Sequence, residues 1–270
     1  MSITTNITDK KYKKLILQVA LDGFSYCVFD TLNHSAEMVE SINFSDFQKN
    51  SKPEELYQKA FSETSVLSHK YDEVLVLHDN NLNTFVPKAL FDKNLLKEYL
   101  QFNNKVFEND FFTFDEMANQ EMNNVYIPYV NINNFLIDWF GSFNYKHSNS
   151  ILVSKLLNLS KNIEERLFFA HVQADKFEIV IVENQKLLLF NSFEYKTKED
   201  FIYYILFVAE QLNLNPEFFK LYLFGDISEE SDLYKIAYKY IRNIDFLDLS
   251  GYQDHFSTAE NSKYFILFNS

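Results

Sequence analysis

Short apolar runs separated by polar turns recur along the chain, and the same order of runs occurs twice. In the first copy, residues 15–29 hold two apolar runs on either side of Asp22, and in the second copy residues 167–182 hold two runs on either side of Asp175. The two turn aspartates are 153 residues apart. Each pair of runs is typical of a β-hairpin, and Asp22-Gly23 is a common tight-turn dipeptide. The repeated pattern indicates an internal duplication.

Each copy continues with a third strand, a helix and a short, fully apolar strand. The short strand ends at Asp79 in the first copy and at Asp226 in the second, 147 residues apart. A helix between two strands implies a parallel crossover. The predicted strands are residues 15–21, 24–29, 36–44, 74–77, 125–130, 167–174, 177–182, 186–193, 221–224 and 245–249. The predicted helices are residues 51–67, 84–102, 132–140, 150–159, 197–212 and 228–241.

Three helix starts carry a local signal. Ser51 with Glu54 forms a capping box, with proline at the first helical position. Thr197 caps a helix that has Asp200 in its first turn, and Ser228 caps another. The sequence therefore predicts an α/β protein with two tandem βββαβα(β) lobes, residues 1–147 and 148–270, each built on a mixed sheet.

Two aromatic segments suggest contacts beyond an ordinary core. Residues 201–209 are apolar nearly all round a helix, which predicts burial against the other lobe or a second subunit. Residues 107–114 contain four phenylalanines in a stretch that is hard to assign. A core strand is one interpretation of that stretch, and an exposed patch for a partner is the other.

Composition excludes several classes of site. The 270 residues include only four glycines, so a Walker-type or GxGxxG phosphate loop cannot be written. Cys27 is the only cysteine, which excludes an internal disulfide and a thiolate metal cluster. The net charge of −13 argues against nucleic acid, because phosphate backbones are bound through Lys and Arg. The sequence predicts no secretory signal and no membrane helix, and therefore a cytoplasmic location.

The element order resembles the ribonuclease-H-like domain that is duplicated in the actin, Hsp70 and sugar-kinase superfamily. The chain resembles more closely the Bacteroidetes domain-of-unknown-function family 3822, over nearly its whole length. This likeness rests on residues 83–92 (NTFVPKALFD), 124–128 (NVYIP), 191–205 (NSFEYKTKEDFIYYI) and 223–225 (LFG). The resemblance implies an actin-like ATPase fold without an established activity.

The resemblance also implies where a nucleotide would bind. Actin-like ATPases hold phosphates and Mg²⁺ at the first hairpin of each lobe, with an aspartate followed by a glycine-rich turn that ends in Ser or Thr. The matching positions are Asp22, Gly23 and Ser25 in the first copy and Asp175 in the second. Gly225 and Asp226 match the adenosine motif. These loops are degenerate, because glycines are missing and Phe24 and Phe177 occupy positions where a phosphate would need room.

Other chemistry has less support. A two-metal nuclease needs a carboxylate in the first strand, where this chain has Gln18 and, in the second copy, Ala170 or His171. His78-Asp79 is the one pair that could act as an oriented base, but a structural role at the strand end is favoured. No histidine pair has metal-ligand spacing. We therefore predict no catalytic residues and no metal ligands.

The sequence favours a cytoplasmic, non-catalytic pseudo-ATPase that acts through an unknown protein partner or as a homo-oligomer, without nucleic acid or membrane. The alternative is a divergent ATPase of the same fold that binds ATP and Mg²⁺. A third possibility is a purely structural subunit of a larger assembly. The first two hypotheses differ in whether ATP with Mg²⁺ stabilises the folded chain.

Overall fold

The computed structural model describes residues 10–44, 52–117, 119–249 and 252–270. The chain forms two compact units, the first made of Met1–Asn80 and Pro128–His147, the second of Asn81–Ile127 and Ser148–Ser270. Residues 81–127, expected within the first lobe, thus group with the second unit. The division of the repeat into residues 1–147 and 148–270 stays a prediction.

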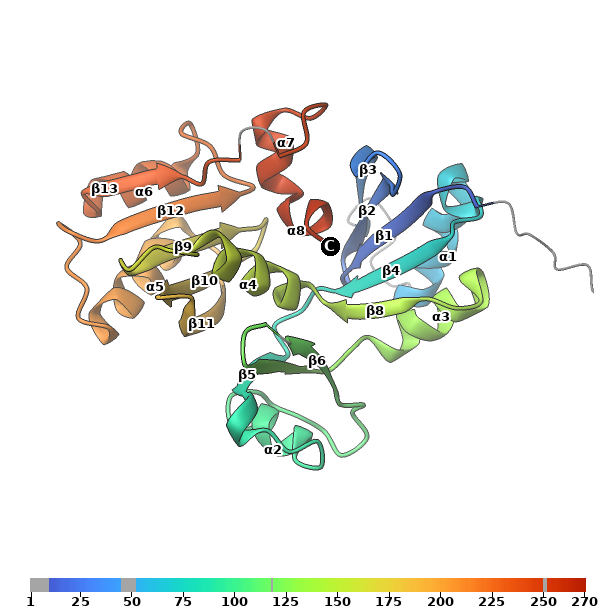
Figure 1. Ribbon diagram of the computed structural model, residues 1–270, viewed down its shortest axis with the longest axis horizontal. Coiled ribbons are helices and arrows are strands. Elements are labelled where there is room, and N and C mark those ends of the chain that lie inside the picture. The colour runs from blue at the N-terminus through green and yellow to red at the C-terminus, as the bar shows by residue number, and fades with distance from the viewer. Residues whose placement is uncertain (1–9, 45–51, 118, 250–251) are drawn as a thin grey trace, which may run out of the picture. The chain divides into compact units, whose positions relative to one another are not determined.

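The first unit is built on a five-stranded mixed sheet with the order β3-β2-β1-β4-β8. β1 is antiparallel to β2 and parallel to β4, as the predicted hairpin and crossover require (Figure 1). Its strands are β1 (Lys13–Val19), β2 (Gly23–Asp30), β3 (Ser35–Asn43), β4 (Glu73–His78) and β8 (Asn144–His147). Its helices are α1 (Pro53–Glu63), the 3₁₀ turn η2 (Ser65–Ser68) and α3 (Val130–Phe140).

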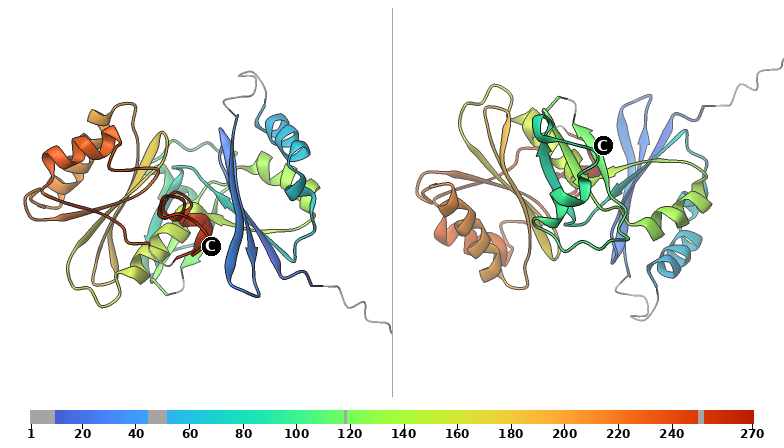
Figure 2. Two further views of the ribbon diagram at one scale, coloured as in Figure 1. Left: turned by 90° about the horizontal axis from the view of Figure 1, so that it is seen from above. Right: turned by 90° about the horizontal axis from the view of Figure 1, so that it is seen from below.

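Helices α1 and α3 cover one face of this sheet and contribute to its core (Figure 2). Alternate residues of β1, such as Leu15 and Leu17, point to that face because side chains alternate along a strand. Phe24 lies there too, stacked on Tyr57 of α1 with ring centroids 5.4 Å apart. The core is thus closed by aromatic contacts between β2 and α1.

The second unit repeats this topology, with the strand order β11-β10-β9-β12-β13. β9 is antiparallel to β10 and parallel to β12, so both predicted copies fold alike. Its strands are β9 (Leu167–Val172), β10 (Lys176–Glu183), β11 (Lys186–Glu194), β12 (Lys220–Gly225) and β13 (Asn243–Phe246). Its helices are α4 (Ser148–Leu159), α5 (Lys198–Gln211), α6 (Asp232–Tyr240), α7 (Thr258–Lys263) and α8 (Phe265–Phe268).

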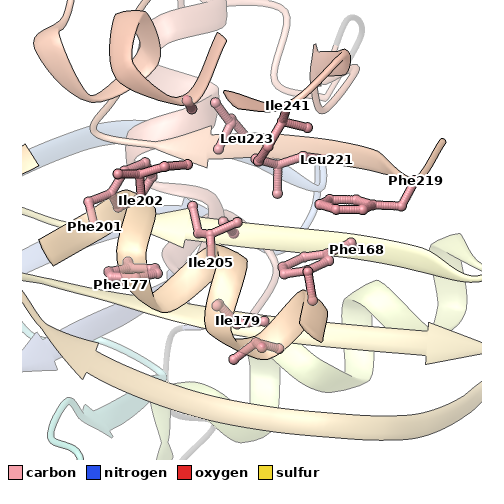
Figure 3. Close-up of a cluster of buried hydrophobic side chains, with 14 of the residues drawn as sticks. Phe168, Phe177, Ile179, Phe201, Ile202, Ile205, Phe219, Leu221, Leu223 and Ile241 are labelled. Carbon is pink, nitrogen blue, oxygen red and sulfur yellow. The ribbon is translucent and has the colours of Figure 1, made fainter. Parts of the chain in front are cut away.

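Helices α5 and α6 cover one face of the second sheet, and α4 lies on the other (Figure 2). Figure 3 shows Phe177 and Ile179 of β10 meeting Phe201 and Ile205 of α5 in the core. Phe177 and Phe201 are fully buried, with ring centroids 4.7 Å apart. The sheet and α5 therefore form one continuous apolar layer.

A small antiparallel sheet with the order β5-β7-β6 belongs to the second unit. Its elements are β5 (Asn83–Pro87), the 3₁₀ turn η3 (Lys88–Leu90), α2 (Leu96–Gln101), β6 (Thr113–Met117) and β7 (Met122–Tyr126). The prediction of one helix over residues 84–102 was wrong, because residues 83–87 pair with β7 about 40 positions later. Asn124 of β7 donates to Ser150 Oγ of α4 at 2.9 Å, which ties the small sheet to the rest of the unit.

The three helix starts with a local signal had different outcomes. Thr197 and Asp200 form the expected capping box of α5. The predicted cap at Ser228 was wrong, because Ser231 caps α6 by accepting a hydrogen bond from the Tyr234 N–H. Pro53 occupies the first turn of α1 as expected, whereas Ser51 lies outside the described residues.

The face of α5 away from the sheet is open within the described part of the chain. Tyr203 is 60% exposed and Phe207 is 42% exposed, and their rings stack with centroids 6.1 Å apart. This face is therefore not covered within its own unit, and the predicted burial against the other lobe or a second subunit stays a prediction. No helix in the described residues is long and apolar enough to cross a membrane.

Candidate functional site

The first hairpin of unit 1 is closed by its own backbone and by one tyrosine. The link between β1 and β2 is only three residues long, and the Ala20 N–H donates to the Gly23 carbonyl at 2.9 Å. The Tyr57 hydroxyl of α1 donates to the Ala20 carbonyl at 2.8 Å and to the Gly23 carbonyl at 3.0 Å. Burial raises the pKa of Tyr57 well above its ordinary value, and the nearby Asp22 adds to this. Tyr57 is therefore a permanent donor that holds the hairpin to α1.

The hairpin of unit 2 has the same arrangement 153 residues later. The Gln173 N–H donates to the Lys176 carbonyl at 2.9 Å. The Tyr195 hydroxyl donates to the Gln173 carbonyl at 2.7 Å, with a longer bond to the next carbonyl. Burial raises the pKa of Tyr195, with smaller contributions from the negative charges of Asp226 and Asp175. Each hairpin is thus pinned by a tyrosine that the sequence analysis did not single out.

The ends of the fourth strands are also equivalent. The Asp79 N–H donates to the Val19 carbonyl at 2.9 Å, and the Asp226 N–H donates to the Val172 carbonyl at 2.8 Å. The two carboxylates differ, because Asp79 is buried and Asp226 is exposed. Gln18 donates to the Asp79 carboxylate at 2.9 Å. The position equivalent to Gln18 is His171, which resolves the choice between Ala170 and His171.

The two glycines at these positions have structural roles. A Cβ on Gly23 would lie 2.3 Å from the carbonyl oxygen of Ile42 in β3, so glycine permits the close pairing of β2 with β3. Gly225 has a φ of +97°, and a Cβ there would lie 2.1 Å from the Val172 carbonyl oxygen. The Gly225 N–H donates to Ser262 Oγ of α7 at 2.8 Å. The Gly225 N–H is therefore already paired and is not available to a ligand.

The structure brings some of the predicted nucleotide-binding residues together. Asp175, Gly225 and Asp226 lie at the same end of the second sheet, because β9 and β12 are parallel and adjacent. Asp22 and Gly23 lie in the first hairpin, but the Ser25 hydroxyl is 2.7 Å from Ser41 Oγ of β3.

Phe24 and Phe177 do not occupy loop positions that a phosphate would need. Both side chains are buried in the cores of their own units. The expectation that they would obstruct a phosphate was therefore wrong, because strand alternation turns both rings toward the covering helices.

The buried histidines have structural partners. His78 Nδ1 accepts a hydrogen bond from the Tyr129 N–H at 3.2 Å, and burial lowers the pKa of His78 to about 4. His78 is therefore a neutral acceptor at neutral pH. His171 Nδ1 lies 2.9 Å from the Glu178 carboxylate, and both side chains are buried. Among the described residues, no three His, Cys, Asp or Glu side chains converge as a metal site.

Comparison with known proteins assigns the chain to a family. The sequence matches the family described as proteins of unknown function, DUF3822, over residues 3–244. The chain belongs to this family. No protein of curated function matches it.

Solved structures show the fold of this chain. A Bacteroides thetaiotaomicron protein with an actin-like ATPase fold and unknown function superimposes with a TM-score of 0.79 at 23% identity, over 90% of this chain and 93% of that one. A chain of the PilM–PilN type IV pilus biogenesis complex gives a TM-score of 0.51 at 11% identity, over 94% and 96%. This family member therefore has the actin-like ATPase fold with two ribonuclease-H-like sheets.

Proposed function

We propose that this DUF3822 protein is a non-catalytic, cytoplasmic member of the actin-like ATPase fold that acts by binding a partner protein. The observation that carries the proposal is the closed environment of Gly225. Its N–H bonds to Ser262 Oγ, and the next N–H bonds to the Val172 carbonyl. These groups lie at the position that matches the adenosine motif, and backbone N–H groups can hold a nucleotide only where they are free. The occupied donors at this position therefore support a protein that no longer binds nucleotide.

The two hairpins support the same conclusion. Each link is three residues long, and the first N–H of each link already pairs across the hairpin. The hairpin corners carry Asp22 in unit 1 and Asp175 and Asp226 in unit 2, and Lys176 follows Asp175. The Lys176 ammonium lies 3.7 Å from the buried Glu178 carboxylate and is therefore already engaged within its own strand.

Exposed aromatic side chains support a protein partner. Tyr203 and Phe207 of α5 are exposed, as is Tyr238 of α6, which packs beside α5. Exposed aromatic groups are enriched at the centres of protein interfaces. One solved structure with this fold is the PilM–PilN biogenesis complex, so the fold occurs in a protein assembly.

A thermal-shift experiment tests the non-catalytic part. Millimolar ATP with Mg²⁺ should leave the melting temperature unchanged, because a ligand stabilises the folded state only if it binds that state. A rise in the melting temperature that Asp22→Ala abolishes would contradict the proposal and favour the divergent ATPase. Asp138→Ala is the matched control, since it removes an exposed carboxylate from α3 in the same unit.

Replacing aromatic residues on α5 tests the interaction part. The Tyr203→Ser/Phe207→Ser double variant should keep its melting temperature within a few degrees and lose a stoichiometric partner that co-purifies with the wild-type chain. Retention of every stoichiometric partner by the double variant would exclude α5 as the interface. Recovery of the wild-type chain alone, as a monomer, would contradict the interaction proposal.

A further inference from the structure

A cavity of about 380 Å³ lies within the second unit, outside the hairpin corners. It is lined by β5, by residues 103–104 and 121–122, and by residues 187–192 of β11. Six consecutive residues of β11 contribute to the lining, although only every second side chain of a strand points to one face. The cavity therefore runs along the edge of β11, where its backbone is accessible.

Within the described parts of the chain, β11 is an edge strand that pairs only with β10. The Tyr195 N–H donates to the Asp175 carbonyl across this pair. Because bonding groups alternate along an antiparallel ladder, the N–H groups of Phe193 and Asn191 also face β10. The N–H groups of Ser192 and Phe190 therefore point away from β10, toward the cavity.

Among the residues that the structure describes, β5 is an edge strand as well and pairs only with β7. The Leu82 carbonyl accepts from the Ile127 N–H, and the Lys88 N–H donates to the Glu121 carbonyl, so even-numbered residues face β7. The backbone groups of Asn83 and Phe85 therefore face outward. Pro87 follows at the next outward position, where the missing N–H of proline costs no ladder bond.

The two edges are held near each other by aromatic contact. The rings of Phe85 and Phe190 meet edge to face with centroids 4.8 Å apart. Ser192 Oγ is buried, and within the described residues it has no hydrogen-bond partner. The cavity thus has on both sides backbone groups that no described strand pairs with, and the Ser192 hydroxyl lies beside them.

The charge of the lining restricts the ligand. Of the described residues that line the cavity, Glu121 is the one charged side chain, and none of them is Lys or Arg. Glu194 adds a negative charge at the end of β11. Its carboxylate accepts a hydrogen bond from the Asn81 side chain at 3.1 Å. An acidic or phosphorylated ligand is therefore disfavoured, and a neutral or basic one is favoured.

We propose that an extended, neutral or basic peptide segment of a partner protein binds as an added strand between β5 and β11. This inference rests on the proposed function, because it defines the partner's chemistry. The added strand exchanges backbone hydrogen bonds with Phe190 and Ser192 on one side and with Phe85 on the other. Edge strands are ready templates for such pairing.

The test uses a phage-displayed library of random octapeptides selected on the full-length chain. The enriched peptides are synthesised and titrated while amide hydrogen exchange is followed. In the free chain, the amides of Phe190 and Ser192 should exchange faster than that of Asn191. Peptide binding should slow exchange at Phe190, Ser192 and Phe85 by tenfold or more. Protection without this alternation, or an absence of enriched peptides, would overturn the proposal.

Two variants separate the backbone from the side chain. Ser192→Pro removes the outward N–H and should weaken peptide binding at least tenfold, whereas Ser192→Ala keeps that N–H and should bind within threefold of wild type. Equal binding by both variants, or loss by Ser192→Ala alone, would instead indicate a site for a small polar ligand. N-methylation of alternate peptide residues provides the same test without altering the protein, and binding that is insensitive to every N-methyl position would overturn strand addition.

These results are independent of the ATP and α5 experiments. A partner that is lost by the α5 double variant but kept by Ser192→Pro would refute the added strand while leaving the proposed function intact. Stabilisation by ATP with Mg²⁺ would contradict the non-catalytic function without affecting the exchange pattern of β11.

Discussion

Gly225 and Val172 lie in such close contact that a methyl group on Gly225 would be 2.1 Å from the Val172 carbonyl oxygen. The glycine also has a φ of +97°, where L-residues other than glycine are strained. The Gly225 N–H donates to Ser262 Oγ, and the Asp226 N–H donates to the Val172 carbonyl. This contact fixes the end of β12 against β9 and α7.

The first prediction concerns this contact. Gly225→Ala should lower the free energy of unfolding by about 3 kcal/mol or more, because it combines a steric overlap with backbone strain. Gly141→Ala is the matched control, since Gly141 has a φ of +81° but no atom within 4 Å of the added methyl group. Its cost should be about 1–3 kcal/mol, from backbone strain alone, because its ψ of −57° lies outside the left-handed helical region. Equal losses in urea unfolding would show that the overlap at Gly225 relaxes.

The second prediction concerns the hairpin tyrosines. Tyr57→Phe should cost about 2 kcal/mol, because two carbonyls lose the buried hydroxyl that donates to them. Tyr195→Phe should cost about 1 kcal/mol, since Tyr195 is only half-buried. Tyr203→Phe removes an exposed hydroxyl and should change stability by less than about 0.5 kcal/mol. Equal stability of all three variants in urea would mean that the hydroxyls do not hold the hairpins.

The third prediction concerns the pH dependence of stability. The pKa of His78 is about 4 in the folded chain, because burial disfavours the charged ring, against an ordinary value of 6.5. The unfolded chain therefore takes up the proton first as the pH falls. Above pH 6.5, His78 is neutral in both the folded and the unfolded chain and does not change the free energy of unfolding. As the pH falls from 6.5 to 4, His78 should progressively lower the free energy of unfolding, by about 2 kcal/mol at pH 5.

His78→Asn provides the comparison for this pH effect. Asparagine keeps an acceptor near the Tyr129 N–H but does not titrate. The difference in unfolding free energy between wild type and variant should therefore shrink by about 2 kcal/mol from pH 7 to pH 5. A difference that is constant with pH would show that His78 titrates normally in the folded chain.

The fourth prediction contrasts the two faces of α5. Phe201→Ala should cost about 3–5 kcal/mol, because this fully buried ring would leave a cavity beside Phe177. Phe207→Ala on the open face should cost less than about 1 kcal/mol. Similar costs in thermal or urea unfolding would indicate that the open face is covered in solution, for example by a second copy of the chain.

Local signals predicted several elements well. The capping box at Thr197 and Asp200 and the proline at Pro53 involve residues within one helical turn, so the sequence alone contains both partners. The alternation and apolar runs of the two hairpins likewise report local burial. Residues 84–102 show where this fails, because the strand there depends on pairing with residues 122–126, which no local pattern specifies.

The sequence predicted where the candidate site residues lie along the chain but not the residues that contact them. The offset of 153 residues located Asp22 and Asp175, but not the tyrosines that pin their hairpins. Tyr57 lies in a helix 34 residues beyond Gly23. Ser262 lies 37 residues beyond Gly225 and belongs to a short helix that carried no predicted role. These partners meet only after the sheets have formed.

The sequence by itself determined the duplication, the order of strands and helices along each copy and the scarcity of glycine, because apolar periodicity and composition are properties of neighbouring positions. The tertiary structure alone decided how the backbone groups at the strand ends are satisfied and which strand edges stay open. Those outcomes depend on hydrogen bonds between residues distant in sequence, since a donor finds its acceptor through proximity in space.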